Sequence, residues 1–545
     1  MFNTFIQQSD GTWNITLTGV NATVTPYTAP VVTPTPPPPP PTTTPSGTVT
    51  VTGTLADGTA VNVSLQAGER KPLVAGKMVG SAVYHADGLS VCIENCYAGT
   101  TADLSGTFTI TAGSTQLFSG PLTIWCYSRT RPFWITQPTV NPNADLSLFP
   151  KLGAAPTASM SAEYAKADNS PMGIGCDVPS IGNGGEWPHL GPVPQWDACY
   201  LTNPSEANAA VVRGMSDAGS PWPYHVIDPA TNAMLDVTKW PKASMLSACF
   251  GTGNPIVKWT TACTLNLGQA QGHATNRSAL ACAIFGTAYD QEELALWNNY
   301  VNSLWQNPGY RLSAGCCNSA HGEHPRSIGR GLTAMLYAAR FSDHPAYFDA
   351  WVQAYAADVT ARLTAQTGIH IDQSALVYPN NGFAPWQNHI ATFAFGLAVQ
   401  FGYTQYQQVL DYMAVTLLDS ILAAQHEFAT LYSVSAKDSN GIASDWWSAL
   451  KMDAAAVPAT VGAAMQQPEN SLALRQAMAE PDAMTPGDFA GHPASPTGYP
   501  SMMRPALALA ARFGTDQTRA QAAWTKFLQH DRADYSQNPK YFIVP

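Results

Sequence analysis

Histidines, acids and tryptophans recur at one kind of position in this sequence, directly before an apolar run with helical periodicity. The clearest case is SAHGEHPRSIGR, from Ser319 to Arg330, which gathers two histidines, a glutamate and two arginines around a proline. Imidazole transfers protons near neutral pH, guanidinium pairs with carboxylate, and indole packs on apolar ring faces. Six of the twelve histidines fall in such segments, so we expect them to share one site.

The residue types in these segments fit a carbohydrate site in which protons move. Helix N-termini around the same mouth would also favour an anionic ligand. For the catalytic roles we select His273, His324, Arg326, His389 and Glu186. For substrate binding we select Trp187, His189, Arg277, Trp386, Asn388, Asp445 and Trp446.

Each of these residues also has a plainer interpretation. A histidine before a helix often serves as a local hydrogen-bonding residue, and Trp386 and Trp446 could be core aromatics. Glu186 and Asp445 could act as the acid and base of a glycosidase, which requires a fixed separation between them. His321 and His324 have the spacing of a metal pair but lack a third ligand. We therefore assign no cofactor and leave a divalent cation open.

The elements that must position these residues are repeated helical hairpins. Each repeat has a helix rich in small residues, a short turn and a second helix striped with aromatics, and the first helix of most repeats ends at a phenylalanine or tyrosine. Six such hairpins predict an (α/α)6 toroid over residues 159–545, with the first helices inside and their N-terminal loops around one mouth. The hairpins begin near Trp196, Arg277, Arg330, His389, Trp446 and Arg504.

The region before the hairpins predicts three further parts. Short alternating runs such as TVTVTGTL and GTFTITAG predict a small β-sandwich or barrel over residues 48–150. Residues 31–47 contain an unbroken proline run, which is typical of an extended, stiff linker. Residues 1–30 hold one alternating segment, Trp13 to Val20, which predicts a single strand in an anchor segment. The fold class is therefore multidomain α+β.

Composition excludes several classes of partner. The chain has 26 basic and 37 acidic residues, a net charge of −11 and no basic run, so we expect no nucleic acid. No apolar run reaches the roughly 18 residues that span a bilayer, and the first residues lack the basic and apolar regions of a cleaved leader. The ten cysteines form no zinc set. We expect most of them to be buried, with one or two disulfides left open.

Two stretches resemble a known family. The run GPVPQWDACYL through SPWPYHVIDPATNAMLDVTKWP, and the later APWQNHIATFAFGLAVQFGY, resemble bacterial (α/α)6 polysaccharide-processing proteins of the exo-acting rhamnogalacturonan lyase type. The resemblance implies a β-domain before a toroid, a polysaccharide ligand and β-elimination beside a uronate carboxylate. The short N-terminal strand and the stiff linker look more like the anchor of a bacteriophage tail fibre or tailspike.

The sequence thus favours a virion protein that binds host surface polysaccharide, and as a further step depolymerises it. Residues 1–30 would join it to other virion or tail proteins, and no insertion into a membrane is expected. Two alternatives remain. One is a free, secreted or cell-surface polysaccharide lyase or glycoside hydrolase with an accessory β-domain, and the other is a structural virion protein without catalysis.

Overall fold

The computed structural model divides the chain into two compact units, Met1–Pro36 and Pro37–Pro545. The residues it describes are 4–7, 13–17, 20–24, 47–177, 188–239, 243–244, 254–255, 276–303, 325–365, 382–383, 385–422, 434–435, 496, 499–529, 531 and 533–545.

The first unit contains a three-stranded antiparallel sheet in the order β1-β2-β3. Its strands are β1 (Thr4–Gln7), β2 (Trp13–Leu17) and β3 (Val20–Val24). The expectation of a single strand in this segment was therefore wrong, because β1 and β3 are only four and five residues long and alternate weakly. Three paired strands satisfy backbone groups that one strand would leave open.

The second unit begins with two four-stranded antiparallel sheets, ordered β10-β9-β4-β5 and β11-β8-β7-β6. Their alternating residues bury one face, as Val49, Val51 and Leu55 do on β4. Inward-facing residues of both sheets form one hydrophobic cluster, which is the arrangement of a β-sandwich. The strands are β4 (Val49–Leu55), β5 (Ala60–Leu65), β6 (Arg70–Val74), β7 (Lys77–Tyr84), β8 (Ser90–Glu94), β9 (Leu104–Ala112), β10 (Thr115–Ile124) and β11 (Phe133–Trp134).

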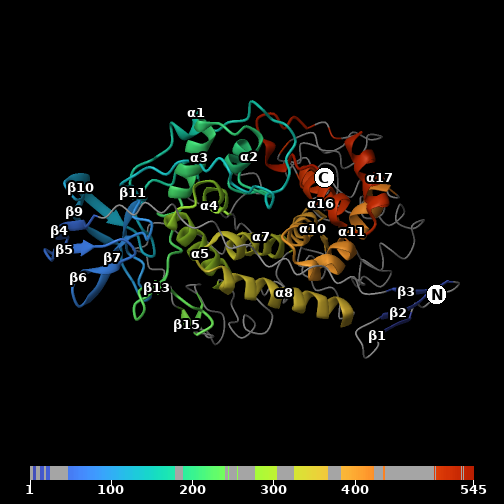
Figure 1. Ribbon diagram of the computed structural model, residues 1–545, viewed down its shortest axis with the longest axis horizontal. Coiled ribbons are helices and arrows are strands. Elements are labelled where there is room, and N and C mark those ends of the chain that lie inside the picture. The colour runs from blue at the N-terminus through green and yellow to red at the C-terminus, as the bar shows by residue number, and fades with distance from the viewer. Residues whose placement is uncertain are drawn as a thin grey trace. The chain divides into compact units, whose positions relative to one another are not determined.

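Helical hairpins follow the sheets, and Figure 1 shows them from α2 in green to α17 in red. Five of the six predicted hairpins have both helices at the expected places, and the one near Trp446 lies outside the described residues. The helix pairs are α2 (Gln195–Thr202) with α3 (Glu206–Asp217), α4 (Ala279–Phe285) with α5 (Ala288–Ser303), α7 (Pro325–Phe341) with α8 (Pro345–Ala365), α10 (Pro385–Gln400) with α11 (Gln407–Leu422), and α16 (Met503–Phe513) with α17 (Gln517–Leu528).

Local chemistry explains where several of these helices begin and end. The Ser205 hydroxyl accepts a hydrogen bond from the Asn208 backbone N–H and caps α3. The Asp516 carboxylate accepts a hydrogen bond from the Arg519 backbone N–H and caps α17. Gly286 ends α4 in the left-handed conformation, with φ of 64°, which glycine adopts without steric cost.

First helices of the hairpins pack side by side, α7 with α10 and α10 with α16, although α10 and α16 belong to the fourth and sixth predicted hairpins. Their small residues permit this approach. A Cβ on Gly329 of α7 would lie 2.5 Å from the Ile390 carbonyl oxygen, and a Cβ on Gly396 of α10 would lie 2.6 Å from the Leu509 Cβ. The apolar stripe of α7 is buried, and it consists of Ile328, Leu332, Met335, Leu336 and Ala339. The mixed α+β architecture is thus confirmed.

The remaining elements are short. The C-terminal turn η7 packs against α2, and Leu152 forms a β-bridge with Ile543, so the C-terminus lies against the segment that enters the first hairpin. The short elements are α1 (Ser161–Tyr164), β12 (Ile227–Asp228), β13 (Ala233–Met234), β14 (Ala243–Ser244), β15 (Asn254–Pro255), β16 (Gly382–Phe383), η4 (Thr404–Tyr406), β17 (Val434–Ser435), η6 (Tyr499–Met502) and η7 (Pro539–Tyr541).

Candidate functional site

Half of the predicted site residues belong to the part of the chain that the structure describes. The residues outside it are Glu186, Trp187, His273, His324, Asp445 and Trp446. The described ones are His189, Arg277, Arg326, Trp386, Asn388 and His389, all on or directly before the first helix of a hairpin.

His189 and Arg277 come together around a third residue, Asp177. The His189 Nδ1 lies 2.8 Å from Asp177 Oδ1, while Arg277 approaches Oδ2 through Nε at 2.8 Å and Nη2 at 2.5 Å. His189 precedes α2 and Arg277 precedes α4. The entries of two different hairpins therefore meet at one carboxylate, and these three residues are called the Asp177 cluster below.

Electrostatics keep the Asp177 carboxylate ionised. Burial by itself raises the pKa of Asp177, but the Arg277 guanidinium and the His189 imidazole outweigh that effect and hold the pKa at about 2. The Arg277 guanidinium also packs on two indoles, 4.8 Å from the Trp222 ring and 5.3 Å from the Trp297 ring. The cluster is therefore buried and charged.

Two polar atoms of the Asp177 cluster are unused. His189 is 1% exposed and Arg277 3%, yet His189 Nε2 and Arg277 Nη1 have no hydrogen-bond partner among the described residues. A buried polar atom without a partner costs free energy, so such atoms are usually satisfied by protein, water or ligand. In the tautomer that carries its proton on Nδ1, beside Asp177 Oδ1, the His189 imidazole presents a lone pair on Nε2, the form that a general base requires.

No local pattern in the sequence points to Asp177. It is a single aspartate in GIGCDVPS, 12 residues before His189 and 100 before Arg277. Only the folded chain brings these three positions to one point.

A second predicted pair also meets, since the Arg326 guanidinium lies 5.8 Å from the centre of the Trp386 ring. Asn388 and His389 follow Trp386 on α10 and are buried. Burial lowers the pKa of His389 to about 3, so its imidazole is neutral at physiological pH. A buried neutral imidazole suits hydrogen bonding better than proton transfer near neutral pH.

The first helices of the five described hairpins enclose a cavity of about 30 Å³. Each helix contributes to its wall, and the contributors include Asp197 on α2, Ala279 on α4, Tyr337 on α7, Phe393 on α10 and Pro505 on α16. The wall is largely apolar. Asn276 and Val193, neighbours in sequence of the Asp177 cluster, line the same cavity, so the two features lie on the same side of the hairpins.

Asp197 is the unusual member of this cavity wall. It is 1% exposed, and neither of its carboxylate oxygens has a hydrogen-bond partner among the residues that the structure describes. Burial raises its pKa well above the ordinary value, because water is excluded and nothing compensates the charge. Asp197 belongs to the stretch WDACYL, which begins a predicted hairpin and is part of the family resemblance, but Asp197 was not among the predicted site residues.

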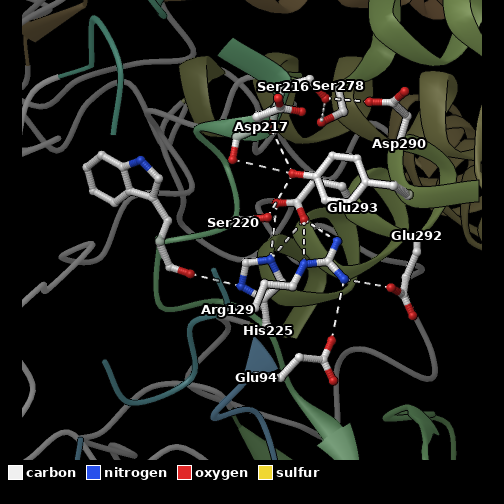
Figure 2. Close-up of polar contacts among 12 residues, drawn as sticks. Glu94, Arg129, Ser216, Asp217, Ser220, His225, Ser278, Asp290, Glu292 and Glu293 are labelled. Atoms are coloured by element: carbon white, nitrogen blue, oxygen red, sulfur yellow. Dashed lines mark hydrogen bonds and ion pairs between the residues drawn. The ribbon is translucent and has the colours of Figure 1, made fainter. Parts of the chain in front are cut away.

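A larger set of charges lies where the sheets meet α5, and Figure 2 shows it. The Arg129 guanidinium lies between the carboxylates of Glu94, Glu292 and Glu293. Glu293 also approaches His225 Nε2 at 3.0 Å. Burial raises the pKa of Glu293, but His225 and Arg129 hold it at about 2. The charges of this junction network pair with one another, so we interpret it as the structural link between the sheets and the helices.

The described residues contain neither a metal centre nor a helix that could span a membrane. Within those ranges, no three His, Cys, Asp or Glu residues are arranged to hold a metal ion, and no helix is long and apolar enough to cross a bilayer. Five of the six cysteines in the described part are buried, and Cys92 and Cys96, which are separated by three residues, are not bonded to each other.

Comparison with family models, curated proteins and solved structures found no match for this chain. Its function must therefore be argued from its own residues.

Proposed function

We propose that this protein processes a uronate-containing polysaccharide by acid–base chemistry at the mouth of an (α/α)6 toroid. The observation that carries the proposal is the Asp177 cluster, in which a buried imidazole and a buried guanidinium each keep one polar atom unpaired among the described residues. These two groups are what elimination beside a carboxylate requires.

The toroid is supported by three features of the second unit. The hairpins occur at the predicted places, the first helices of all five described hairpins line one cavity, and the C-terminal turn η7 packs against α2 of the first hairpin. We infer from these contacts that the row of hairpins closes into a ring. In such a ring the entries of the first helices would surround one opening, and we propose that the Asp177 cluster lies there.

The proposed chemistry assigns one role to each residue of the cluster. Arg277 Nη1 binds the uronate carboxylate and lowers the pKa of the neighbouring C–H group by neutralising the charge that develops there. His189 Nε2 removes that proton, the bond to the leaving oxygen breaks, and the electron pair forms the carbon–carbon double bond. The leaving oxygen takes a proton from solvent. Asp177 positions both groups and does not touch the substrate.

The test is turnover of uronate-containing polysaccharides, read as ultraviolet absorbance of the unsaturated product together with new reducing ends. We expect His189→Gln and Arg277→Lys to lower kcat/KM by about 100-fold or more, since a positioned general base contributes roughly 10²–10⁴-fold. His344→Gln, in the partly exposed turn between α7 and α8, is the matched control and keeps wild-type turnover.

Two results would contradict this assignment. Reducing ends without the absorbance mean hydrolysis, which removes the base role of His189. Binding without either signal means a receptor-recognition protein, and His189→Gln would then change affinity alone.

We further propose that the protein is carried on a virion through its N-terminal segment. Support comes from Met1–Pro36, which forms a compact unit of its own with a three-stranded sheet, and from the proline-rich linker that follows. Deleting residues 1–36 is expected to leave polysaccharide turnover at the wild-type level and to abolish incorporation into particles. Normal incorporation of the truncated protein would refute the anchor role.

A further inference from the structure

The central cavity holds more hydrogen-bonding capacity than its own residues use. The Asp197 carboxyl, the Tyr337 hydroxyl and the Asn276 Oδ1 all line it, and none of these atoms has a partner within the described ranges. Asn276 is fixed from its other end, because its Nδ2 donates to the Thr333 carbonyl at 3.3 Å. Tyr337 is held by stacking on Phe149 at 4.9 Å. The unpaired atoms are therefore pre-positioned.

The size of the cavity limits what can enter it. Its volume of about 30 Å³ exceeds the roughly 10–15 Å³ that one water molecule needs, but it is far below the roughly 300–1,000 Å³ of pockets that enclose whole ligands. A sugar ring would not fit, whereas a substituent of a few heavy atoms would. Most of the remaining wall is apolar, with Val193 and Phe393 among its residues beside Arg330 and Thr333, and so favours a methyl group.

The unused atoms match one substituent in both number and kind. A protonated carboxyl and a phenol can each donate to a carbonyl oxygen, while an amide oxygen can accept from an N–H group. Burial raises the pKa of Asp197 well above its ordinary value and so favours the protonated carboxyl. The complementary group has one carbonyl oxygen, one N–H and one small apolar end.

We propose that this cavity binds the acetamido group of an N-acetylated sugar. The carbonyl oxygen accepts from Asp197 and Tyr337, the N–H donates to Asn276 Oδ1, and the methyl group packs against Val193 and Phe393. This inference deepens the proposed function and depends on it for the source of the group, a polysaccharide that carries both uronate and N-acetylated residues. The uronate would lie at the Asp177 cluster and its acetamido neighbour over the cavity.

The first test uses small probes and the full-length protein. Acetamide and N-acetylglucosamine are titrated by calorimetry and by saturation-transfer NMR on the acetyl methyl protons, with glucose and acetate as controls. We expect both acetamido probes to bind and glucose not to. Acetate tests the competing ligand class, an anion held by Arg330, which also lines the cavity. Binding of acetate without acetamide, or equal binding of glucose and N-acetylglucosamine, would overturn the proposal.

Variants then separate binding from folding. Tyr337→Phe removes one neutral hydrogen bond and should weaken the binding of N-acetylglucosamine about fivefold. Asp197→Asn keeps a donor to the carbonyl and should retain binding, whereas Asp197→Leu should weaken it tenfold or more. Because the carboxyl has no partner in the described structure, Asp197→Leu should also raise the melting temperature. A Leu variant that is more stable and binds as well as wild type would mean that the cavity holds only water.

The same experiments distinguish this inference from the proposed function. His189→Gln should lose turnover of the polymer but keep N-acetylglucosamine binding. If wild type binds the acetamido probes and cleaves no uronate polymer, the proposed function fails and the acetamido site stands. If it cleaves uronate polymers and binds no acetamido probe, only the acetamido site fails.

Discussion

Asp177→Asn is the most informative single change, because it removes the charge that organises the Asp177 cluster and keeps the shape of the side chain. Asparagine cannot neutralise the Arg277 guanidinium, and its amide can present an N–H group to His189 Nδ1 instead of an acceptor. The imidazole would then carry its proton on Nε2, the atom that has to act as the base. We therefore expect loss of turnover by about 100-fold or more.

The cost in stability follows from the pKa of Asp177. Its folded value of about 2 lies below the ordinary value of 3.8, and each pKa unit corresponds to about 1.4 kcal/mol, so the ionised carboxylate contributes about 2.5 kcal/mol at neutral pH. Because the folded pKa is depressed, this contribution is complete above pH 3.8 and is lost as the pH falls toward 2. The variant should lack that part of the acid destabilisation.

The assay combines urea unfolding between pH 2 and 7 with initial rates on a uronate polysaccharide. Asp57→Asn is the matched control, because Asp57 is exposed and its hydrogen bond from the Thr59 N–H survives in asparagine. A variant that loses about 2.5 kcal/mol but keeps wild-type kcat/KM would show that the Asp177 cluster is purely structural. If the variant keeps both the wild-type stability and the wild-type kcat/KM, the contacts of Asp177 with His189 and Arg277 are refuted.

Two further changes test the scaffold. Glu293→Gln should lower the free energy of unfolding by about 3 kcal/mol at pH 7, since Arg129 and His225 hold the Glu293 pKa at about 2 against an ordinary 4.5. Urea unfolding measures this loss, with the exposed residue change Glu163→Gln as the control. If both variants lose the same free energy of unfolding, the structural role of the junction network is contradicted. Gly396→Ala should lower the free energy of unfolding by about 1–3 kcal/mol, because the new methyl group would lie 2.6 Å from Leu509. Thermal unfolding measures this loss. The control is Gly47→Ala, whose new methyl group would meet no atom within 4 Å.

Local patterns in the sequence were enough to predict the strands, the helical hairpins and the polar residues at the helix entries. Alternation predicted the strands of the two sheets, since one face of each strand is buried and the period is two. Helical periodicity and repetition predicted the hairpins, because each first helix must pack against a neighbour of the same design. The positions of the histidines and arginines before the helices could also be predicted, because the first turn of a helix has unpaired N–H groups and polar residues often precede it.

Tertiary structure alone decided which of those residues meet. Asp177 stands 100 residues from Arg277, and their contact depends on how two hairpin entries converge. Asp197 looked like one more polar residue of a helix, and only the packing of the first helices around one cavity makes it a buried acid. The junction network likewise joins Arg129 to Glu293 across the boundary between sheet and helix. Ion pairs and cavities form between segments distant along the chain, and neither periodicity nor composition encodes a distance.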